Sequence, residues 1–144
     1  MKIVNNVKMI LPARSGNESF ARASVAAFCA SIFPTIEEVN DIKTAVSEAV
    51  TNVIVHAYPD NMGEITIDVA LYDDKVVEIT VTDEGKGIQD YEEARKPFFT
   101  TKSEEEHSGM GFTIMEAFMD ETEVITEVGR GTTVKMRKKI GKNA

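Results

Sequence analysis

Three residues that could act together in catalysis, Glu48, Asn52 and His56, follow one another at intervals of four. In an α-helix this spacing lines side chains up on one side, roughly 6 Å apart along the axis. A carboxylate there can accept a proton or orient a hydroxyl group, and an amide oxygen suits a hard cation such as Mg²⁺. A helix with a few polar residues at its rim would have the same spacing, so the row alone leaves both interpretations open. His56 fits packing at a helix end better than catalysis.

Two glycine segments could hold a nucleotide. Asp83, at the end of a predicted strand, could accept a hydrogen bond from an exocyclic amine, and Gly85 and Gly87 would let the backbone pass close to a flat ring. Gly109 and Gly111 open a predicted helix, whose free amides and positive dipole end suit phosphates. An ordinary turn would also explain the first segment, and a flexible hinge the second. The sequence has no Walker phosphate loop and lacks the third glycine of a Rossmann site.

The composition is that of an acidic globular protein. The 144 residues include 24 Asp and Glu against 16 Lys and Arg, giving a net charge of −8. This length favours one domain spanning 1–144, and the acidity argues against direct binding of nucleic acid or of an anionic membrane. The single cysteine, Cys29, allows no internal disulfide. Without a membrane-length apolar run or a signal-peptide core, the chain is expected in the cytoplasm.

Capping patterns predict where two helices begin. Ser15 with Glu18, and Thr35 with Glu38, have the three-residue spacing of a capping box. Arg14 and Arg22 are expected on the outside of the first helix. Apolar residues at steps of three and four predict the buried faces. These are Phe20, Ala23, Ala27 and Phe28 in the first helix, and Ile36, Val39, Ile42, Val46, Ala49, Val50, Val53 and Ile54 in the central helix, which is expected to reach His56.

Alternating apolar residues predict five strands. The basic run 135–139 is interpreted as a solvated strand edge, where lysines prevent pairing with other chains. Between the third and fourth strands the sequence predicts a short acidic helix at 90–96, a long functional or disordered loop, and a helix from Gly109–Gly111 to about Met119. The predicted strands cover 5–12, 65–71, 77–82, 121–128 and 132–140.

These segments occur in the order that marks the GHKL superfamily, to which gyrase, Hsp90, histidine kinases and MutL belong. Glu48-x-x-x-Asn52 resembles its N box, and the segments at Asp83 and at Gly109 resemble its two glycine boxes. Pro97–Lys102 resembles the lid entry, and Gly131-Thr132 the threonine position on the last strand. Within the superfamily, Ser47–Asn52, Phe98–Thr101 and Ser108–Glu116 are most similar to the anti-sigma-factor serine kinases, above all those of sporulation.

The resemblance implies a Bergerat-type α/β two-layer sandwich, with a mixed, mostly antiparallel sheet covered by helices on one face. It also implies that ATP and Mg²⁺ bind between the central helix and the lid. Glu48 would act in catalysis and Asn52 would hold the metal. The residues expected to bind the nucleotide are Asn52, Asp83, Gly85, Gly87, Thr100, Thr101, Lys102, Ser108, Gly109, Met110, Gly111, Phe112 and Thr132.

The partners implied by the resemblance are proteins. Such chains form homodimers, hold a sigma factor of the sporulation sigma F type inactive, and phosphorylate a serine of an anti-anti-sigma protein. Arg14 and Arg22 are the candidate partner-binding residues, because exposed arginines stand out in an acidic chain and are enriched at interface hot spots. One departure concerns the lid, where relatives often have arginine and this chain has His107.

Three other functions fit parts of the pattern. An ATPase module like gyrase or Hsp90 would need a transducer domain, for which the chain has no room. A histidine-kinase catalytic domain would follow a phosphoacceptor helix pair and typically lacks glutamate at the Glu48 position. A nucleotide-gated GHKL binding module without kinase activity remains the alternative to the kinase.

Overall fold

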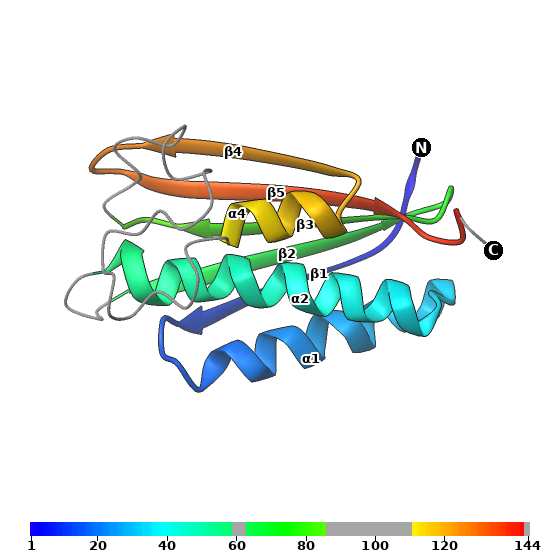
Figure 1. The fold of residues 1–144 in the computed structure, drawn as a ribbon, viewed down its shortest axis with the longest axis horizontal. Helices are drawn as coiled ribbons and strands as arrows, with labels where there is room; N and C mark the ends of the chain where they lie inside the picture. The colour runs from blue at the N-terminus through cyan, green and yellow to red at the C-terminus, as the bar shows by residue number, and fades with distance from the viewer. Residues whose placement is uncertain (59–62, 86–110, 143–144) are drawn as a thin grey trace.

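The computed structural model describes residues 1–58, 63–85 and 111–142, which form one β-sheet with helices packed on it (Figure 1). A 3-10 turn (Ala30–Ile32) directly follows the first helix, and a π-helical turn (Val53–Ala57) directly follows the second. The strands are β1 (Ile3–Pro12), β2 (Glu64–Tyr72), β3 (Val76–Asp83), β4 (Glu121–Glu127) and β5 (Gly131–Lys139). The helical elements are α1 (Asn17–Cys29), η1 (Ala30–Ile32), α2 (Ile36–Asn52), η2 (Val53–Ala57) and α4 (Gly111–Phe118).

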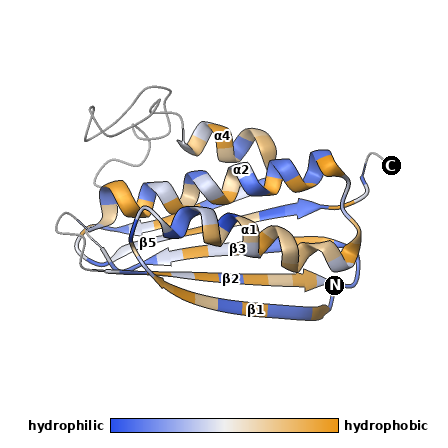
Figure 2. Ribbon diagram, turned by 90° about the horizontal axis from the view of Figure 1, so that it is seen from below, coloured by the Kyte–Doolittle hydropathy of each residue, from blue (hydrophilic) through white to orange (hydrophobic). Residues whose placement is uncertain are grey.

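The sheet has the strand order β1-β2-β3-β5-β4, and each of these pairs is antiparallel. The helices cover one face of it, as the view from below shows (Figure 2). The predicted two-layer α/β sandwich is therefore confirmed. No parallel pair occurs among the described strands, although the resemblance implied a mixed sheet. None of the helices in this part of the chain is long and apolar enough to span a membrane.

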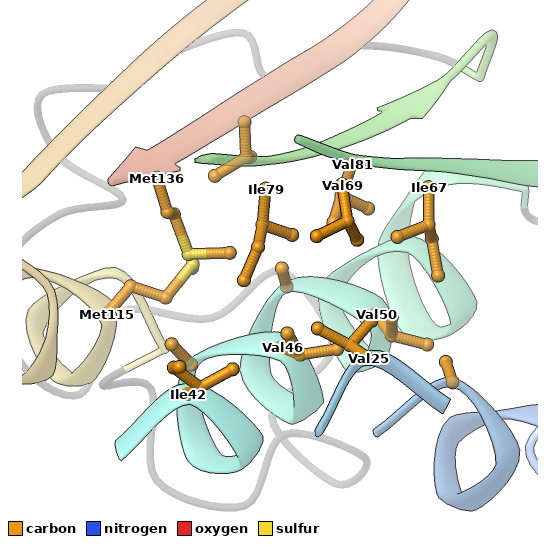
Figure 3. Close-up of a cluster of buried hydrophobic side chains, with 14 of the residues drawn as sticks. Val25, Ile42, Val46, Val50, Ile67, Val69, Ile79, Val81, Met115 and Met136 are labelled. Carbon is orange, nitrogen blue, oxygen red and sulfur yellow. The ribbon is translucent and has the colours of Figure 1, made fainter. Parts of the chain in front are cut away.

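The core lies between the sheet and α2. Alternate residues of β2 and β3, such as Ile67 and Ile79, point from the sheet toward Val46 and Val50 of the helix (Figure 3). This follows from the two periods of the sequence, two in the strands and 3.6 in the helix. Full burial of one such side chain contributes about 1.5–3 kcal/mol, so the position of α2 over the sheet is strongly fixed.

Helix α1 turns a different face inward from the one predicted. Phe20 is 56% exposed, and Ile36 at the start of α2 is 81% exposed. The predicted face combined two phenylalanines with two alanines, whereas α1 packs beside α2 through small residues at four-residue steps that begin one position later. Bulky residues at those positions would hold the two helices apart. The buried residues of α1 are Ala21, Val25 and Cys29, with Phe28 partly buried and Ala23 and Ala27 exposed.

Only one of the two predicted capping boxes forms. Thr35 caps α2, because its hydroxyl accepts from the Glu38 amide at 3.1 Å and the Glu38 carboxylate accepts from the Thr35 amide at 2.8 Å. At α1 the N-cap is Gly16, which makes no side-chain cap. Glu18 instead turns toward α2 and accepts a 2.6 Å hydrogen bond from the Ser47 hydroxyl.

The basic run at the end of the chain is an interior strand, so the prediction of a solvated edge is wrong. Strand β5 lies between β3 and β4, and its Met136 is fully buried. Two of its cations pair with acidic residues of neighbouring elements. Arg137 forms ion pairs with Glu78 of β3 and Glu121 of β4, and Lys138 lies 3.4 Å from Asp41 of α2. The basic run therefore belongs to a paired strand whose cations find acidic partners on neighbouring strands and on α2.

Glu38 connects the start of α2 to the end of the chain. Besides capping its own helix, its carboxylate accepts from the Gly141 amide at 2.9 Å. Burial alone would raise the pKa of Glu38, but the Thr35 and Gly141 amides and the nearby Lys138 hold this pKa below its ordinary value. The ionised carboxylate therefore stabilises the folded chain.

We predict that Glu38→Gln lowers the free energy of unfolding at pH 7 by about 1–2 kcal/mol, the scale for hydrogen bonds to a charged group. Because the folded-state pKa is lowered, the contribution is present above the ordinary carboxyl pKa and is lost as pH falls toward the folded-state value. Urea unfolding of both proteins at pH 7 and at acidic pH measures this. Glu37→Gln, the same change at an exposed neighbour, is the control. Equal stability of the Glu38 and Glu37 variants at pH 7 would contradict the assignment.

Candidate functional site

Glu48 and Asn52 lie on the flank of α2 that faces α4. Both belong to the last turns of the α-helix, so their four-residue spacing does place them on one side. Ser47, one residue earlier, points about 100° away and contacts α1 through Glu18. After Asn52 the helix widens into the π-helical turn η2, which contains His56. Such a widened turn shifts the phase of the row, so His56 does not simply extend it.

The first residue of α4 comes close to this flank. A methyl group at Gly111 would lie 3.1 Å from Asn52 Nδ2 and 3.4 Å from Glu48 Oε2. A side chain at this position would therefore fill the space in front of both polar groups. The following Phe112 is 7% exposed and anchors the helix in the core. Gly111 thus keeps the carboxylate and the amide accessible at the beginning of α4.

Asp83 ends β3 with a buried carboxylate, 7% exposed. Its Oδ1 accepts from the backbone amides of Gly85 at 2.9 Å and Thr132 at 3.3 Å. Burial raises the pKa of Asp83, an effect that these two amides partly offset. Both hydrogen bonds that the described residues give the carboxylate end on Oδ1. Its other oxygen, Oδ2, is the atom left to accept from a ligand.

Thr132 lies directly opposite Asp83 in the pairing of β3 with β5. Its hydroxyl is 2.9 Å from that of Thr126 on β4, which fixes its position. Gly131 before it has φ +119°, and a methyl group there would overlap the carbonyl oxygen of Asp83. Only glycine fits this approach, so β5 can begin close enough for the Thr132 amide to reach the Asp83 carboxylate.

Gly85 packs on the end of η2. A methyl group at Gly85 would overlap the carbonyl oxygen of Ala57, so glycine is required for the loop after β3 to lie against this turn. Tyr58 also joins this region, and sequence reasoning missed both Ala57 and Tyr58. Their only signal was position, since they directly follow the polar row of the central helix.

The described part of the chain contains seven of the predicted site residues, and they lie at the C-terminal part of α2, the end of β3, and the starts of α4 and β5, where Gly111 is followed by the buried Phe112 (Figure 1). Glu48, Asn52 and Gly111 form one group, and Asp83 and Thr132 form the other. Gly85 adjoins the second group. The remaining predicted residues, Gly87, Thr100, Thr101, Lys102, Ser108, Gly109 and Met110, lie outside the described residues, as do His107 and the predicted helix at 90–96.

The two predicted partner-binding arginines lie elsewhere, around the start of α1. Arg14 is exposed in the connection that leads from β1 into α1. Arg22 is one turn into the helix, with 39% of its side chain exposed, and its guanidinium lies 3.8 Å from the Glu18 carboxylate. Neither residue contributes to the two groups of site residues.

The chemistry of the two groups fits a purine nucleotide. A carboxylate at a strand end with one oxygen held by backbone amides can accept from an exocyclic amine with the other, and a glycine beside it admits a flat ring. The start of α4 offers backbone amides and a positive dipole end to phosphate groups. The Asn52 amide suits a hard cation, and the Glu48 carboxylate lies beside it.

Solved structures share this fold. The chain superposes with a TM-score of 0.70 and 23% identity on a crystal structure of RsbU and RsbW domains from Mycobacterium tuberculosis, over 95% of this chain and 33% of that one. The histidine kinase domain of a blue-light activated kinase from Erythrobacter litoralis gives a TM-score of 0.60 at 19% identity, over 85% of this chain and 60% of that one. At such identities the likeness concerns the fold alone.

Sequence comparison goes further. Residues 11–138 match the family model described as the histidine kinase-like ATPase domain. The chain is 56% identical over 143 residues to an anti-sigma F factor of Caldanaerobacter subterraneus subsp. tengcongensis, covering 99% of both chains. It is 55% identical over 139 residues to that of Geobacillus kaustophilus, covering 96% of this chain and 95% of the relative. The chain therefore belongs to the histidine kinase-like ATPase (GHKL) family and, within it, to the group of the anti-sigma F factors.

Proposed function

We propose that this protein is an anti-sigma factor that is also an ATP- and Mg²⁺-dependent protein-serine kinase. It sequesters a sporulation sigma factor of the sigma F type and phosphorylates a serine of an anti-anti-sigma protein. It acts as a homodimer in the cytoplasm, where transcription takes place. Near-full-length identity to chains named anti-sigma F factor supports the first activity. The observation that carries the second is the convergence of Glu48 and Asn52 on Gly111.

In this proposal each residue around Gly111 has a separate task. Bound ATP supplies the phosphoryl group, and Mg²⁺ would be held by Asn52 together with phosphate and water oxygens. Glu48 orients the serine hydroxyl of the substrate protein and takes its proton, while the serine oxygen bonds to the terminal phosphorus and the bond to the ADP oxygen breaks. Gly111 and Phe112 begin the helix whose amides face the phosphates.

The group around Asp83 would recognise the base. Oδ2 of Asp83 accepts from the amino group of adenine, while Gly85 leaves room for the ring and Thr132 supports the carboxylate. We extend the family pattern to the segment that the structure does not describe. There Thr100, Thr101, Lys102, Ser108, Gly109 and Met110 would contact the phosphates, and Gly87 the base.

Replacing the proposed base tests the chemistry directly. Glu48→Gln should retain ATP binding but lower phosphoryl transfer to the anti-anti-sigma protein by roughly 10²-fold or more, the usual contribution of a positioned base. Asn52→Ala should lose Mg²⁺-dependent nucleotide binding. Transfer is measured with labelled ATP, and binding by titration. Glu37→Gln, the same change on an exposed turn of α2, is the control.

The outcomes separate kinase from binding module. Wild-type transfer by the Glu48 variant would remove Glu48 from catalysis. Wild-type protein that binds ATP and the sigma factor but transfers no phosphate would favour a nucleotide-gated binding module without catalysis.

The role of Asp83 predicts both base selectivity and pH dependence. GTP presents a carbonyl where ATP has an amine, so two acceptors would face each other and GTP should bind much more weakly. Because burial raises the pKa of Asp83, protonation should weaken ATP binding at a higher pH than for an ordinary aspartate. Asp83→Asn should reduce the difference between the affinities for ATP and GTP, since the asparagine amide can donate to the carbonyl of GTP. Asp68→Asn, on β2, is the control. Equal wild-type affinities for ATP and GTP would contradict this role.

Charge reversal at Arg22 tests the partner surface. Arg22→Glu should weaken binding of the sigma factor, the anti-anti-sigma protein or both by more than about 2 kcal/mol, the hot-spot threshold. ATP affinity should stay unchanged, because Arg22 lies apart from the nucleotide groups. Arg14→Glu tests the neighbouring arginine, and Glu18→Gln, which removes the ion-pair partner while keeping the arginine, is the control. Unchanged affinity of Arg22→Glu for both proteins would exclude Arg22 from the interface, and lost ATP binding would indicate a damaged fold.

A further inference from the structure

The hydroxyl group of Tyr58 joins three segments that meet beside Asp83. Tyr58 directly follows the π-helical turn η2. Its hydroxyl donates to the carbonyl of Glu64 at the start of β2 and accepts from the amide of Glu84 in the loop after β3, both at 2.8 Å. One atom therefore fixes the spacing between the end of the central helix and the ends of two neighbouring strands.

The bond to Glu84 acts on the peptide that follows the base-reading residue. Two successive amides of this loop are held, that of Glu84 by Tyr58 and that of Gly85 by Asp83 Oδ1 at 2.9 Å. With both amides fixed, the loop backbone cannot rotate without breaking a hydrogen bond. The Asp83 carboxylate is thereby held with Oδ1 on the backbone amides, which leaves Oδ2 as the oxygen that these amides do not occupy.

Burial and packing keep the Tyr58 hydroxyl protonated and its ring in place. Burial raises the pKa of Tyr58, as does the charge of Asp83, while the Glu84 amide partly offsets these effects. The group therefore stays protonated and able to donate near neutral pH. A methyl group at Gly63 would overlap the tyrosine ring, so glycine lets the start of β2 lie flat on it. Packing thus sets the ring, and the two hydrogen bonds set the loop.

We propose that Tyr58 is a positioning residue of the nucleotide site, which orients the Asp83–Gly85 loop for recognition of the adenine amino group. This rests on the proposed role of Asp83 in binding ATP. Tyr58 acts through the loop and touches neither the phosphates nor the substrate serine. Its loss should therefore weaken recognition of the base and leave the chemical step unchanged.

Tyr58→Phe is the matched test, because it removes the hydroxyl and keeps the ring that packs on Gly63. We expect the KM for ATP to rise about tenfold, the effect of losing hydrogen bonds of ordinary strength. The kcat at saturating ATP should stay within about twofold, and the preference for ATP over GTP should narrow. In a double-mutant cycle, Tyr58→Phe should add little to Asp83→Asn, since both act on the same contact.

Tyr72→Phe is the control, because Tyr72 lies at the far end of β2 and its hydroxyl also makes a hydrogen bond, to Glu78. It should leave KM, kcat and base preference unchanged. An unchanged KM in Tyr58→Phe, or a fall in kcat as large as the rise in KM, would overturn the positioning role. Wild-type protein that binds no ATP would instead overturn the proposed function itself.

Hydrogen exchange in the wild-type protein provides a test that needs no stable variant. The Glu84 amide should exchange much more slowly than an open loop amide, because its hydrogen is bonded to Tyr58. Exchange at the rate of a free amide would show that the hydroxyl does not hold the loop, and the proposal would fail.

Discussion

The structure depends on the requirement that one helix, α2, build the core and the site with different sides. Ile42, Val46 and Val50 are fully buried against the sheet, and this fixes the rotation of the helix about its axis. Once that rotation is set, Ser47 and Glu48 face different flanks, since neighbours in a helix point about 100° apart. Ser47 meets α1 through Glu18, and Glu48 meets Gly111 of α4.

Close backbone approach is the second constraint, and it explains where glycine is needed. Gly85 lies on the carbonyl of Ala57, Gly131 on that of Asp83, and Gly111 in front of Asn52. A side chain at Gly85 or Gly131 would overlap the neighbouring backbone, and one at Gly111 would crowd the Asn52 and Glu48 side chains. The close approach at Gly131 brings the Thr132 amide to the buried Asp83 carboxylate. This hydrogen bond offsets part of the cost of removing the carboxylate from water.

Much of this arrangement could be predicted from the sequence because it follows from period and spacing. The alternation of apolar and polar residues in β2 and β3 predicted their buried faces, and the Thr35–Glu38 spacing predicted a helix cap that forms. The placement of Glu48 and Asn52 on one side of α2 could be predicted from the geometry of a helix alone. The family resemblance then supplied what spacing cannot, namely which separate segments are expected to form one site.

The failures share a physical cause, since they concern surfaces whose neighbours lie far away in the sequence. Phe20 is hydrophobic enough for a core, but the close packing of α1 on α2 selected small residues instead. The lysines and arginine of β5 suggested an edge, because their acidic partners, such as Glu78 and Asp41, lie on other elements. Tyr58 carries no motif, and its importance comes from two backbone groups that the fold brings to its hydroxyl.

The same helix also relates the proposed partner surface to the proposed active site. Arg22 pairs with Glu18, and Glu18 accepts from Ser47, the residue next to Glu48. A protein that draws Arg22 away would leave the Glu18 carboxylate with its Ser47 bond but without its nearest cation. Ser47 and Glu48 lie on different flanks of α2, whose rotation is fixed by its buried side. In this proposal, one helix contacts the segment around Arg22 on one flank, through Ser47 and Glu18, and the candidate nucleotide residue Gly111 on the other.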